Sequence, residues 1–262
     1  MTHVAPIIEL HPWLALPPGQ ALLDWEQAQM DRLVADRFGF HALQLGLPEL
    51  DALRANRMPH RWLAVDAGYA AWQPAQGLSL QTDSVPLGLR CEFESLPFPS
   101  QSLDLVVLPH ALELVPDPHD TLREVERVLV PEGRVVIAGF NPASLWGLGQ
   151  RLGRWGGGSA GILPQGDFIA HWRLRDWLRL LDLEVESGFF GCYRPMVRRA
   201  RTWERLQWME HAGDRWWPVF GAVYFVVAVK RTRAMRIVGK VRRSTVVTAP
   251  KPAVVAQRDG MT

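Results

Sequence analysis

Two hydrophobic patterns alternate along this chain. Short runs that are almost wholly apolar predict strands buried on both faces of a sheet. Stretches with apolar side chains every three or four residues predict helices packed against that sheet. Alternation of the two argues for an α/β fold with a mostly parallel sheet. The predicted strands are 41–45, 61–66, 90–94, 103–108, 134–140, one flanked by 183–186 and 191–193, and 222–229.

The predicted helices carry an apolar stripe and recognisable end signals. Asp117 and Pro118 suit the N-cap and the first position of one helix, which Glu132 and Gly133 are expected to end. In the first helix, Glu26 is assigned with the neighbouring aspartates to the polar face. The predicted helices are 20–37, 48–57, the one that opens at 117–118, and a stripe from 174 to 181.

Shifts in composition divide the chain into three parts. Residues 1–19 hold four prolines and predict an extended lead-in, and residues 20–230 form the domain. Residues 231–262 are basic and then rich in Thr, Pro and Ala, which predicts a disordered tail. The glycine-rich segment 141–166 predicts either a lid over a substrate or a plain surface linker.

Composition excludes several classes of protein. Of the 262 residues, 48% are hydrophobic and 21% are charged, which is typical of a globular chain. Cys91 and Cys192 cannot form a disulfide framework or, without histidines nearby, a structural zinc site. No apolar run reaches the roughly 20 residues of a transmembrane segment, and the N-terminus lacks a basic signal region. We therefore expect a cytoplasmic protein with reduced thiols.

The net charge of +2 hides a strong asymmetry along the chain. Residues 1–186 carry 14 basic against 23 acidic side chains, whereas residues 187–262 carry 15 against 4. Within the basic part, residues 230–243 offer contacts to nucleic acid or to another anionic surface. We favour the prediction of a solvated tail for this stretch, because runs of charged residues are usually solvated.

The ends of the predicted strands are where a ligand is expected. In an open α/β sheet, ligands bind beyond the carboxyl ends of the strands, at the point where the strand order reverses. Gly46 follows the first strand and Asp66 ends the second, at the spacing from which an acid reaches a nucleotide ribose. The other candidates are Glu92 and Phe93 at the third strand, and Pro109 and His110 after the fourth.

Residues 91–142 carry an ordered set of short motifs. These are Leu-Pro-Phe at 96–98, Leu-Asp-Leu at 103–105, Arg-Glu-Val-Glu-Arg-Val-Leu at 123–129 and Pro-Glu-Gly at 131–133. In order and spacing the segment resembles the class I S-adenosylmethionine-dependent methyltransferases of the small-molecule type, the type 11-like group. The resemblance implies one Rossmann-like domain with a seven-stranded sheet, an antiparallel last strand and helices on both faces. It also implies methyl transfer from S-adenosylmethionine to a small or medium-sized acceptor.

The resemblance assigns roles position by position. Gln44 stands where the family has an acidic residue, and Gly46 is the first glycine of the cofactor loop. The resemblance puts the ribose on Asp66 and the adenine amine on Glu92, which suits carboxylates because they accept hydrogen bonds. The remaining assignments are Phe93 beside the adenine ring, and Pro109 and His110 near the transferred methyl group.

The first loop departs from the family pattern. Members carry an acid followed by three alternating glycines, whereas this chain reads Gln-Leu-Gly-Leu-Pro-Glu-Leu from 44 to 50. Pro48 offers no N–H, Leu50 adds bulk, and Glu49 adds negative charge near the expected methionine carboxylate, each at a cost of about 1 kcal/mol or more. The leading function is a methyltransferase, and the second is a catalytically inactive methyltransferase-like binding or regulatory protein. A third is a nucleic-acid-associated protein that uses the basic C-terminus.

His110 is the one candidate for acid–base chemistry after a central strand. A neutral imidazole there can act as a general base, and the alternative is a packed, hydrogen-bonded histidine. Methyl transfer needs mainly positioning and exclusion of water, so an obligatory base is not expected. The acceptor pocket is expected to be built by the segments 1–25, 141–172 and 194–218, and its substrate is not readable from the sequence.

Overall fold

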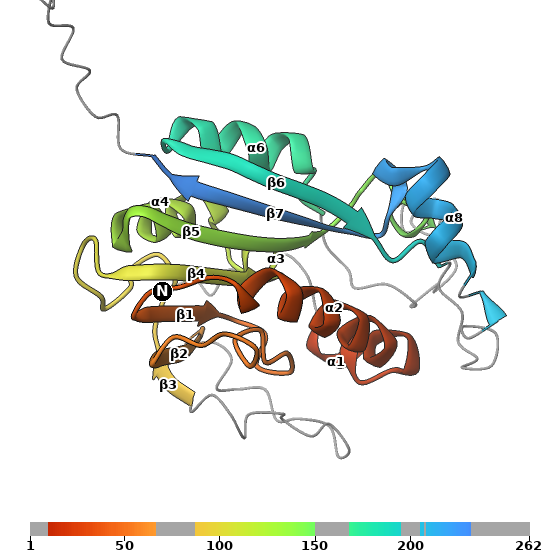
Figure 1. Cartoon of the computed structure of the whole chain (residues 1–262). Helices are drawn as coiled ribbons and strands as arrows, with labels where there is room; N and C mark the ends of the chain where they lie inside the picture. The colour runs from red at the N-terminus through yellow and green to blue at the C-terminus, as the bar shows by residue number, and fades with distance from the viewer. Residues whose placement is uncertain (1–9, 67–86, 150–167, 195–204, 207, 232–262) are drawn as a thin grey trace, which may run out of the picture. The chain divides into compact units, whose positions relative to one another are not determined.

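Seven strands form one sheet in the order β3-β2-β1-β4-β5-β7-β6 (Figure 1). The computed structural model describes residues 10–66, 87–149, 168–194, 205, 206 and 208–231. The sheet is parallel from β3 to β5, and β7 runs antiparallel between β5 and β6. The mostly parallel α/β fold that the sequence predicts is confirmed. The strands are β1 (His41–Leu45), β2 (His60–Val65), β3 (Leu87–Arg90), β4 (Leu103–Pro109), β5 (Leu129–Phe140), β6 (Leu183–Gly191) and β7 (Val223–Lys230).

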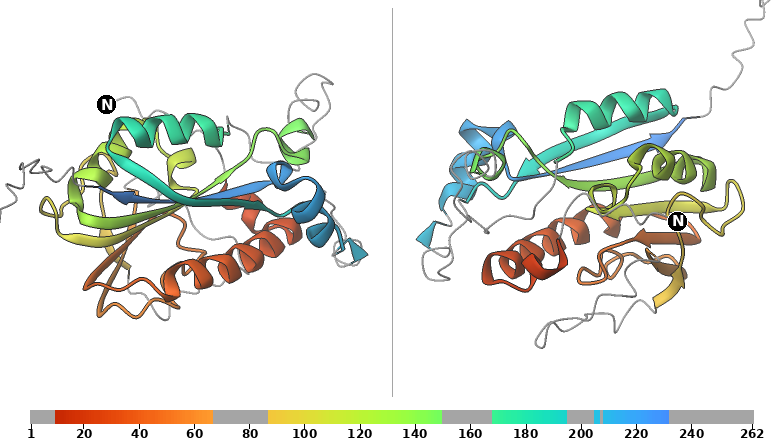
Figure 2. Two further views of the ribbon diagram at one scale, coloured as in Figure 1. Left: turned by 45° about the horizontal axis from the view of Figure 1, so that its top comes forward. Right: turned by 180° about the vertical axis from the view of Figure 1, so that it is seen from behind.

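Helices cover both faces of this sheet (Figure 2). The short α1 (His11–Leu14) and the long α2 (Pro17–Ala35) pack on one face. On the other face lie α3 (Ala111–Leu114), α4 (Pro118–Val128) and α6 (His171–Leu180). The chain between β6 and β7 forms α8 (Trp208–Trp216) and the short 3-10 helix η2 (Pro218–Phe220).

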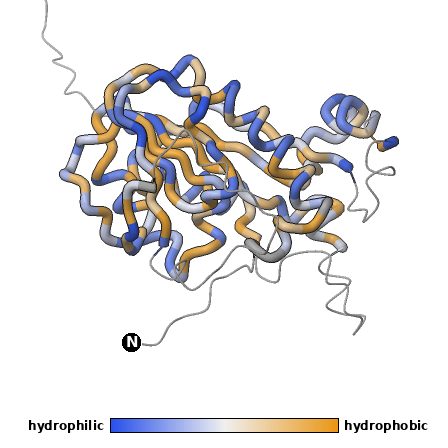
Figure 3. The backbone as a smooth tube through the Cα atoms, turned by 90° about the horizontal axis from the view of Figure 1, so that it is seen from below, coloured by the Kyte–Doolittle hydropathy of each residue, from blue (hydrophilic) through white to orange (hydrophobic). Residues whose placement is uncertain are grey.

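Successive side chains of the central strands enter two different cores. In β4, Leu105 and Val107 pack on the α2 side, while Val106 and Leu108 pack on the α4 and α6 side, and all four are fully buried. A strand covered on both faces needs apolar side chains in both directions, which explains its continuous apolar run. Figure 3 shows an apolar centre with segments of mixed polarity around it.

Several predicted boundaries differ from the structure. The helix expected at 48–57 does not form, because this segment runs through turns. The third strand ends at Arg90 where it was expected to begin, and α4 already ends at Val128 because β5 starts at Leu129, ahead of the expected stop signal. The lead-in expected over 1–19 contains α1 and the first turn of α2.

The start of α4 follows the prediction. The Asp117 carboxylate accepts hydrogen bonds from the backbone N–H groups of His119 at 2.8 Å and Asp120 at 3.2 Å, and Pro118 takes the first helical position. A cap of this kind satisfies donors that the first turn cannot satisfy itself.

The division of the chain into parts stays a prediction. Contacts separate Met1–Thr232 from Arg233–Thr262, and the second part lies outside the described residues. The segments 67–86 and 150–167, and nearly all of the basic stretch 230–243, lie outside them as well. Among the described residues, no helix is both long and apolar enough to cross a bilayer.

The helix α6 offers a matched test of the core on its face of the sheet. Leu174 is fully buried, whereas Leu180 on the same helix is 82% exposed. We expect Leu174→Ala to lower the free energy of unfolding by about 2–5 kcal/mol, because the change leaves a cavity. Leu180→Ala is expected to change it by less than about 0.5 kcal/mol. Urea denaturation followed by circular dichroism measures both, and equal losses would contradict this burial.

Candidate functional site

The strand order reverses between β1 and β4, so their carboxyl ends mark the expected ligand crevice. Gly46 and Leu47 follow β1 with φ angles of +74° and +44°, and His110 follows β4 with φ +52°. A side chain in this left-handed region costs about 1–2 kcal/mol, so Leu47 and His110 store strain at the two ends that meet here. Strain of this kind persists only where surrounding contacts hold the backbone, and it concentrates at functional sites.

The ends of β2 and β3 bring two carboxylates to the same edge. Val65 pairs with Arg90, and the Cys91 N–H donates to the Val65 carbonyl at 3.2 Å. Asp66 is therefore near Cys91, and burial together with the Asp66 charge raises the pKa of the Cys91 thiol to about 11. Glu92, the next residue along, is exposed.

Phe93 links these acids to the loop after β1. Its side chain is buried, and one ring atom lies 3.6 Å from the point where a Cβ on Gly46 would stand. The structure thus brings Gly46 and Phe93 together, with Asp66 and Glu92 at the ends of the adjoining strands. These are four of the seven residues that the sequence singled out.

Gln44 uses its amide to shape the first loop. Its Nε2 lies within hydrogen-bond distance of three carbonyl oxygens, those of Gly46 at 3.2 Å, Leu47 at 3.1 Å and Leu50 at 2.6 Å. Its Oε1 accepts from the Ala52 N–H at 2.9 Å. These bonds fold the chain inward between residues 46 and 52, which explains why the expected helix at 48–57 is absent.

The loop is closed by its side chains as well. Leu47 and Leu50 are buried in the same core as Trp13 and Leu14 of α1. Of the two residues that replace glycines of the family pattern, Pro48 is buried as well, and Leu50 thus adds to the core under the loop. Gln44 is buried among backbone groups, so its role in this geometry is to position the loop.

His110 lies in a buried cluster of three charged residues. Its Nδ1 is 2.7 Å from Glu113 Oε2, and its Nε2 is 2.8 Å from Glu26 Oε1. The second oxygen of Glu113 accepts from the Phe140 N–H at 2.7 Å. All three charged side chains are about 1% exposed or less. We call Glu26, His110 and Glu113 the buried triad.

The buried triad holds a proton at neutral pH. Burial alone would lower the pKa of His110, but the Glu26 charge and the hydrogen bonds that the ring donates to both carboxylates outweigh it and raise the pKa to about 10. Burial also raises the pKa of Glu113. With both ring nitrogens engaged and a proton already bound, His110 has no free lone pair to accept another. The geometry therefore favours the packed, hydrogen-bonded alternative over a general base.

Glu26 is the functional candidate that the sequence reasoning missed. It was assigned to the polar face of its helix, and that assignment is wrong, because Glu26 is fully buried. The signal was its position four residues after Leu22 and four before Met30, both of which are also fully buried. A charged residue at the spacing of an apolar stripe marks a buried charge that needs a partner. Pro109, the last residue of β4, is likewise buried, beside His110.

Part of the chain matches a known family model, and several known proteins are similar to it. Residues 52–137, which run from the turns after β1 into β5, match the family model described as methyltransferase domain. The chain is 27% identical over 231 residues to the uncharacterized protein YafS of Escherichia coli, covering 84% of this chain and 80% of YafS. It is 33% identical to a ubiquinone biosynthesis O-methyltransferase of Xanthomonas oryzae over 115 residues, which are 40% of this chain and 46% of that enzyme.

Solved structures share the fold. A putative methyltransferase of Haloferax volcanii, solved in complex with the methyltransferase activator Trm112, is similar with a TM-score of 0.57 and 21% identity, covering 86% of this chain and 97% of its own. A methyltransferase of Thermotoga maritima, described as a possible histamine N-methyltransferase, gives a TM-score of 0.54 at 12% identity, with 80% and 92% covered. At these identities the likeness shows the fold alone.

The Gln44 bonds give a test of the loop. Gln44→Glu places an acceptor where three carbonyls need a donor, so we expect a loss of about 3 kcal/mol in the free energy of unfolding at pH 7. The loss should shrink toward pH 5, because a protonated glutamate again offers an O–H donor. Urea denaturation at both pH values measures it, with Gln20→Glu at an exposed position as control. A loss below about 0.5 kcal/mol at pH 7 would contradict this role.

The buried triad predicts a pH dependence of stability. Unfolded, His110 binds a proton only below about pH 6.5, whereas the folded pKa is about 10. Between these values the folded state binds more protons, so the free energy of unfolding falls as pH rises, by up to about 1.4 kcal/mol per pH unit. Glu26→Gln removes the partner that raises this pKa most and should flatten the slope.

Urea denaturation at several pH values from 6.5 to 9.5 measures the slope for the wild type and for Glu26→Gln. Asp24→Asn is the control, because Asp24 lies on the same helix with its side chain exposed. The control should keep the wild-type slope. An unchanged slope in Glu26→Gln would show that the proton is not held by the buried triad.

Proposed function

This chain has the class I methyltransferase fold and a matched methyltransferase domain, and on that premise we propose that it transfers a methyl group from S-adenosylmethionine to a small or medium-sized acceptor. The observation that supports this most is the meeting of Gly46, Asp66, Glu92 and Phe93 at the ends of β1, β2 and β3, beside the point where the strand order reverses. When bound, the cofactor would supply an activated methyl group.

The residues at the ends of β2 and β3 fit the nucleoside half of the cofactor. Asp66 and Glu92 offer carboxylate oxygens, which can accept from a ribose diol and from an adenine amine. Phe93 offers an apolar face between them and the first loop. Gly46 provides a backbone without a side chain, in a left-handed conformation that favours glycine.

The loop after β1 fits the methionine half less directly. The carbonyls of Gly46, Leu47 and Leu50 are engaged by Gln44, and Pro48 has no N–H to offer. The methionine half must therefore be held by groups outside the two replaced glycine positions. We infer that most of the affinity for the cofactor comes from Asp66 and Glu92.

The buried triad positions the site rather than reacting in it. Glu26 ties α2 to the end of β4, and Glu113 ties the same histidine to Phe140, the last residue of β5. Together these bonds hold α2 and the end of β5 against the carboxyl end of β4, beside Pro109. We propose that His110 acts as a positioning residue, since methyl transfer depends on orientation and on exclusion of water.

The similar proteins do not identify the methyl acceptor of this chain. The family match covers β2 to β4 and part of β5, so it includes Asp66 and Glu92 but not Gly46. The part of the chain from α6 to β7 lies outside that match, and in this fold variable segments build acceptor sites on a common frame.

Calorimetric titration with S-adenosylmethionine and S-adenosylhomocysteine tests the proposal. We expect submillimolar binding that Glu92→Ala weakens by about tenfold, since a charged hydrogen bond contributes about 1.5–3 kcal/mol. Glu94→Ala is the matched control, because Glu94 is an exposed acid two residues further on. It should change the affinity by less than about twofold. No heat at millimolar ligand would overturn the transferase and leave the binding or regulatory protein.

A further inference from the structure

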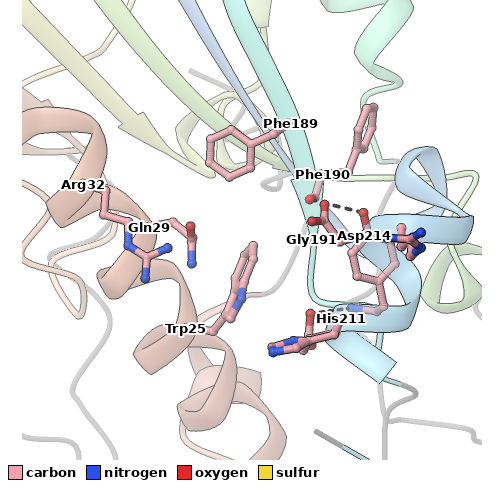
Figure 4. A pocket seen from close by; sticks show the side chains of 11 residues that line it. Trp25, Gln29, Arg32, Phe189, Phe190, Gly191, His211 and Asp214 are labelled. Carbon is pink, nitrogen blue, oxygen red and sulfur yellow. Dashed lines mark hydrogen bonds between the residues drawn. The ribbon is translucent and has the colours of Figure 1, made fainter. Parts of the chain in front are cut away.

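A pocket of about 650 Å³ lies at the carboxyl end of β6, between α2 and α8 (Figure 4). This volume falls within the range of about 300–1,000 Å³ that is usual for small-molecule sites. The pocket is lined by residues of three elements that are distant in sequence: α2, the end of β6 with the residues after it, and α8. The residues that line this pocket lie outside the family match, and they differ from the residues at the reversal of strand order.

One wall of the pocket is a fixed aromatic surface. The Trp25 ring packs against the backbone of Gly191, so closely that a Cβ on that glycine would lie 2.2 Å from it. Trp25 and Phe189 both rest on Phe225 of β7, with ring centroids 5.9 Å and 5.0 Å from it. The Phe189 and Phe225 rings are nearly parallel, at 14°. These side chains are already ordered, so an aromatic ligand would bind them without the entropy cost of immobilising them.

The facing wall is held equally firmly. The Tyr193 hydroxyl donates to the Pro218 carbonyl at 2.9 Å, and its ring fills the space beside Gly213 of α8. Glu210 is engaged there, because it accepts from the Tyr193 N–H and pairs with Arg194 at 3.0 Å. Its charge is therefore already balanced within the protein.

The cation on the α2 side is available to a ligand. Gln29 and Arg32 follow Trp25 at spacings of four and three, which places all three on one face of the helix toward the pocket. Within the described part of the chain, Arg32 is exposed and has no ion-pair or hydrogen-bond partner. On α8 the exposed charges of Asp214 and Arg215 have opposite sign, so Arg32 decides the sign of the group that the pocket favours.

We propose that this pocket binds a planar aromatic acid, with the ring on Trp25 and Phe189 and the carboxylate on Arg32. An arginine fork matches a carboxylate in geometry as well as charge. Trp25 directly precedes Glu26, which contacts His110 at the end of β4, so one helix joins this pocket to the reversal of strand order. We assign this aromatic acid as the methyl acceptor, and that assignment rests on the proposed function. The binding of the acid to the pocket does not rest on it.

Calorimetry with 2-naphthoate, 2-naphthamide and cyclohexanecarboxylate tests the binding. Naphthoate should bind about tenfold more tightly than the neutral amide, and about tenfold more tightly than the non-aromatic acid. Arg32→Gln should remove the preference for naphthoate over naphthamide while leaving the affinity for naphthamide unchanged. Arg57→Gln, at another exposed arginine, should leave both affinities as they are. Equal binding of acid and amide by the wild type would overturn the proposal.

A second titration places the site and separates it from the cofactor crevice. Naphthoate and S-adenosylhomocysteine should bind together, because an acceptor and a donor occupy such a protein at the same time. Displacement of one by the other would put naphthoate in the crevice and overturn the pocket. If naphthoate binds as described while S-adenosylhomocysteine gives no heat, the pocket stands and the methyl transfer fails. If only S-adenosylhomocysteine binds, the pocket fails and the proposed function stands.

Discussion

The contact of His110 with two buried carboxylates is the interaction on which the geometry of the site depends. The imidazole joins α2, the end of β4 and α3, and the Glu113 carboxylate extends the link to the end of β5. Such a cluster is costly to assemble, because its charges leave water, and apolar residues of equal size would often be as stable. The cluster instead fixes the position of α2 on the sheet, because Glu26 contacts His110 only when the helix lies in this position. Removing one member would leave an unpaired buried charge, at a cost of about 3–5 kcal/mol.

This position of α2 has consequences at two places. Glu26 faces the end of β4, where His110 is held in a left-handed backbone conformation that the triad contacts can sustain. Its neighbour Trp25 packs on Phe225 and on the backbone of Gly191 at the end of β6. A shift of α2 along the sheet would disturb both contacts at once. The helix therefore fixes the aromatic pocket and the reversal of strand order in a constant relation to each other.

The sequence predicts the sheet well because its signal is local. Strands such as 41–45 and 103–108 are apolar runs whose burial on both faces can be read from the run itself. Candidate residues at strand ends followed from the same reasoning, and Asp66 and Glu92 do stand at adjacent strand ends. The burial of Glu26 was not predicted, because its polarity was given more weight than its spacing. The turns at 48–57 were not predicted either. Helical periodicity takes no account of Gln44, whose amide donates to the backbone carbonyls that follow it.

The same glutamine explains how the loop tolerates its departures from the family pattern. An acid at position 44 would repel the three carbonyls that now converge on the amide, so Gln44 is required once the loop folds inward. Inward folding in turn buries Pro48 and Leu50, which makes apolar residues favourable at the two positions where glycines are usual. These changes form one coupled set, and none of them lies at the ends of β2 or β3. A cofactor that binds this chain would therefore be recognised chiefly through its nucleoside, at the part of the crevice that the rebuilt loop does not reach.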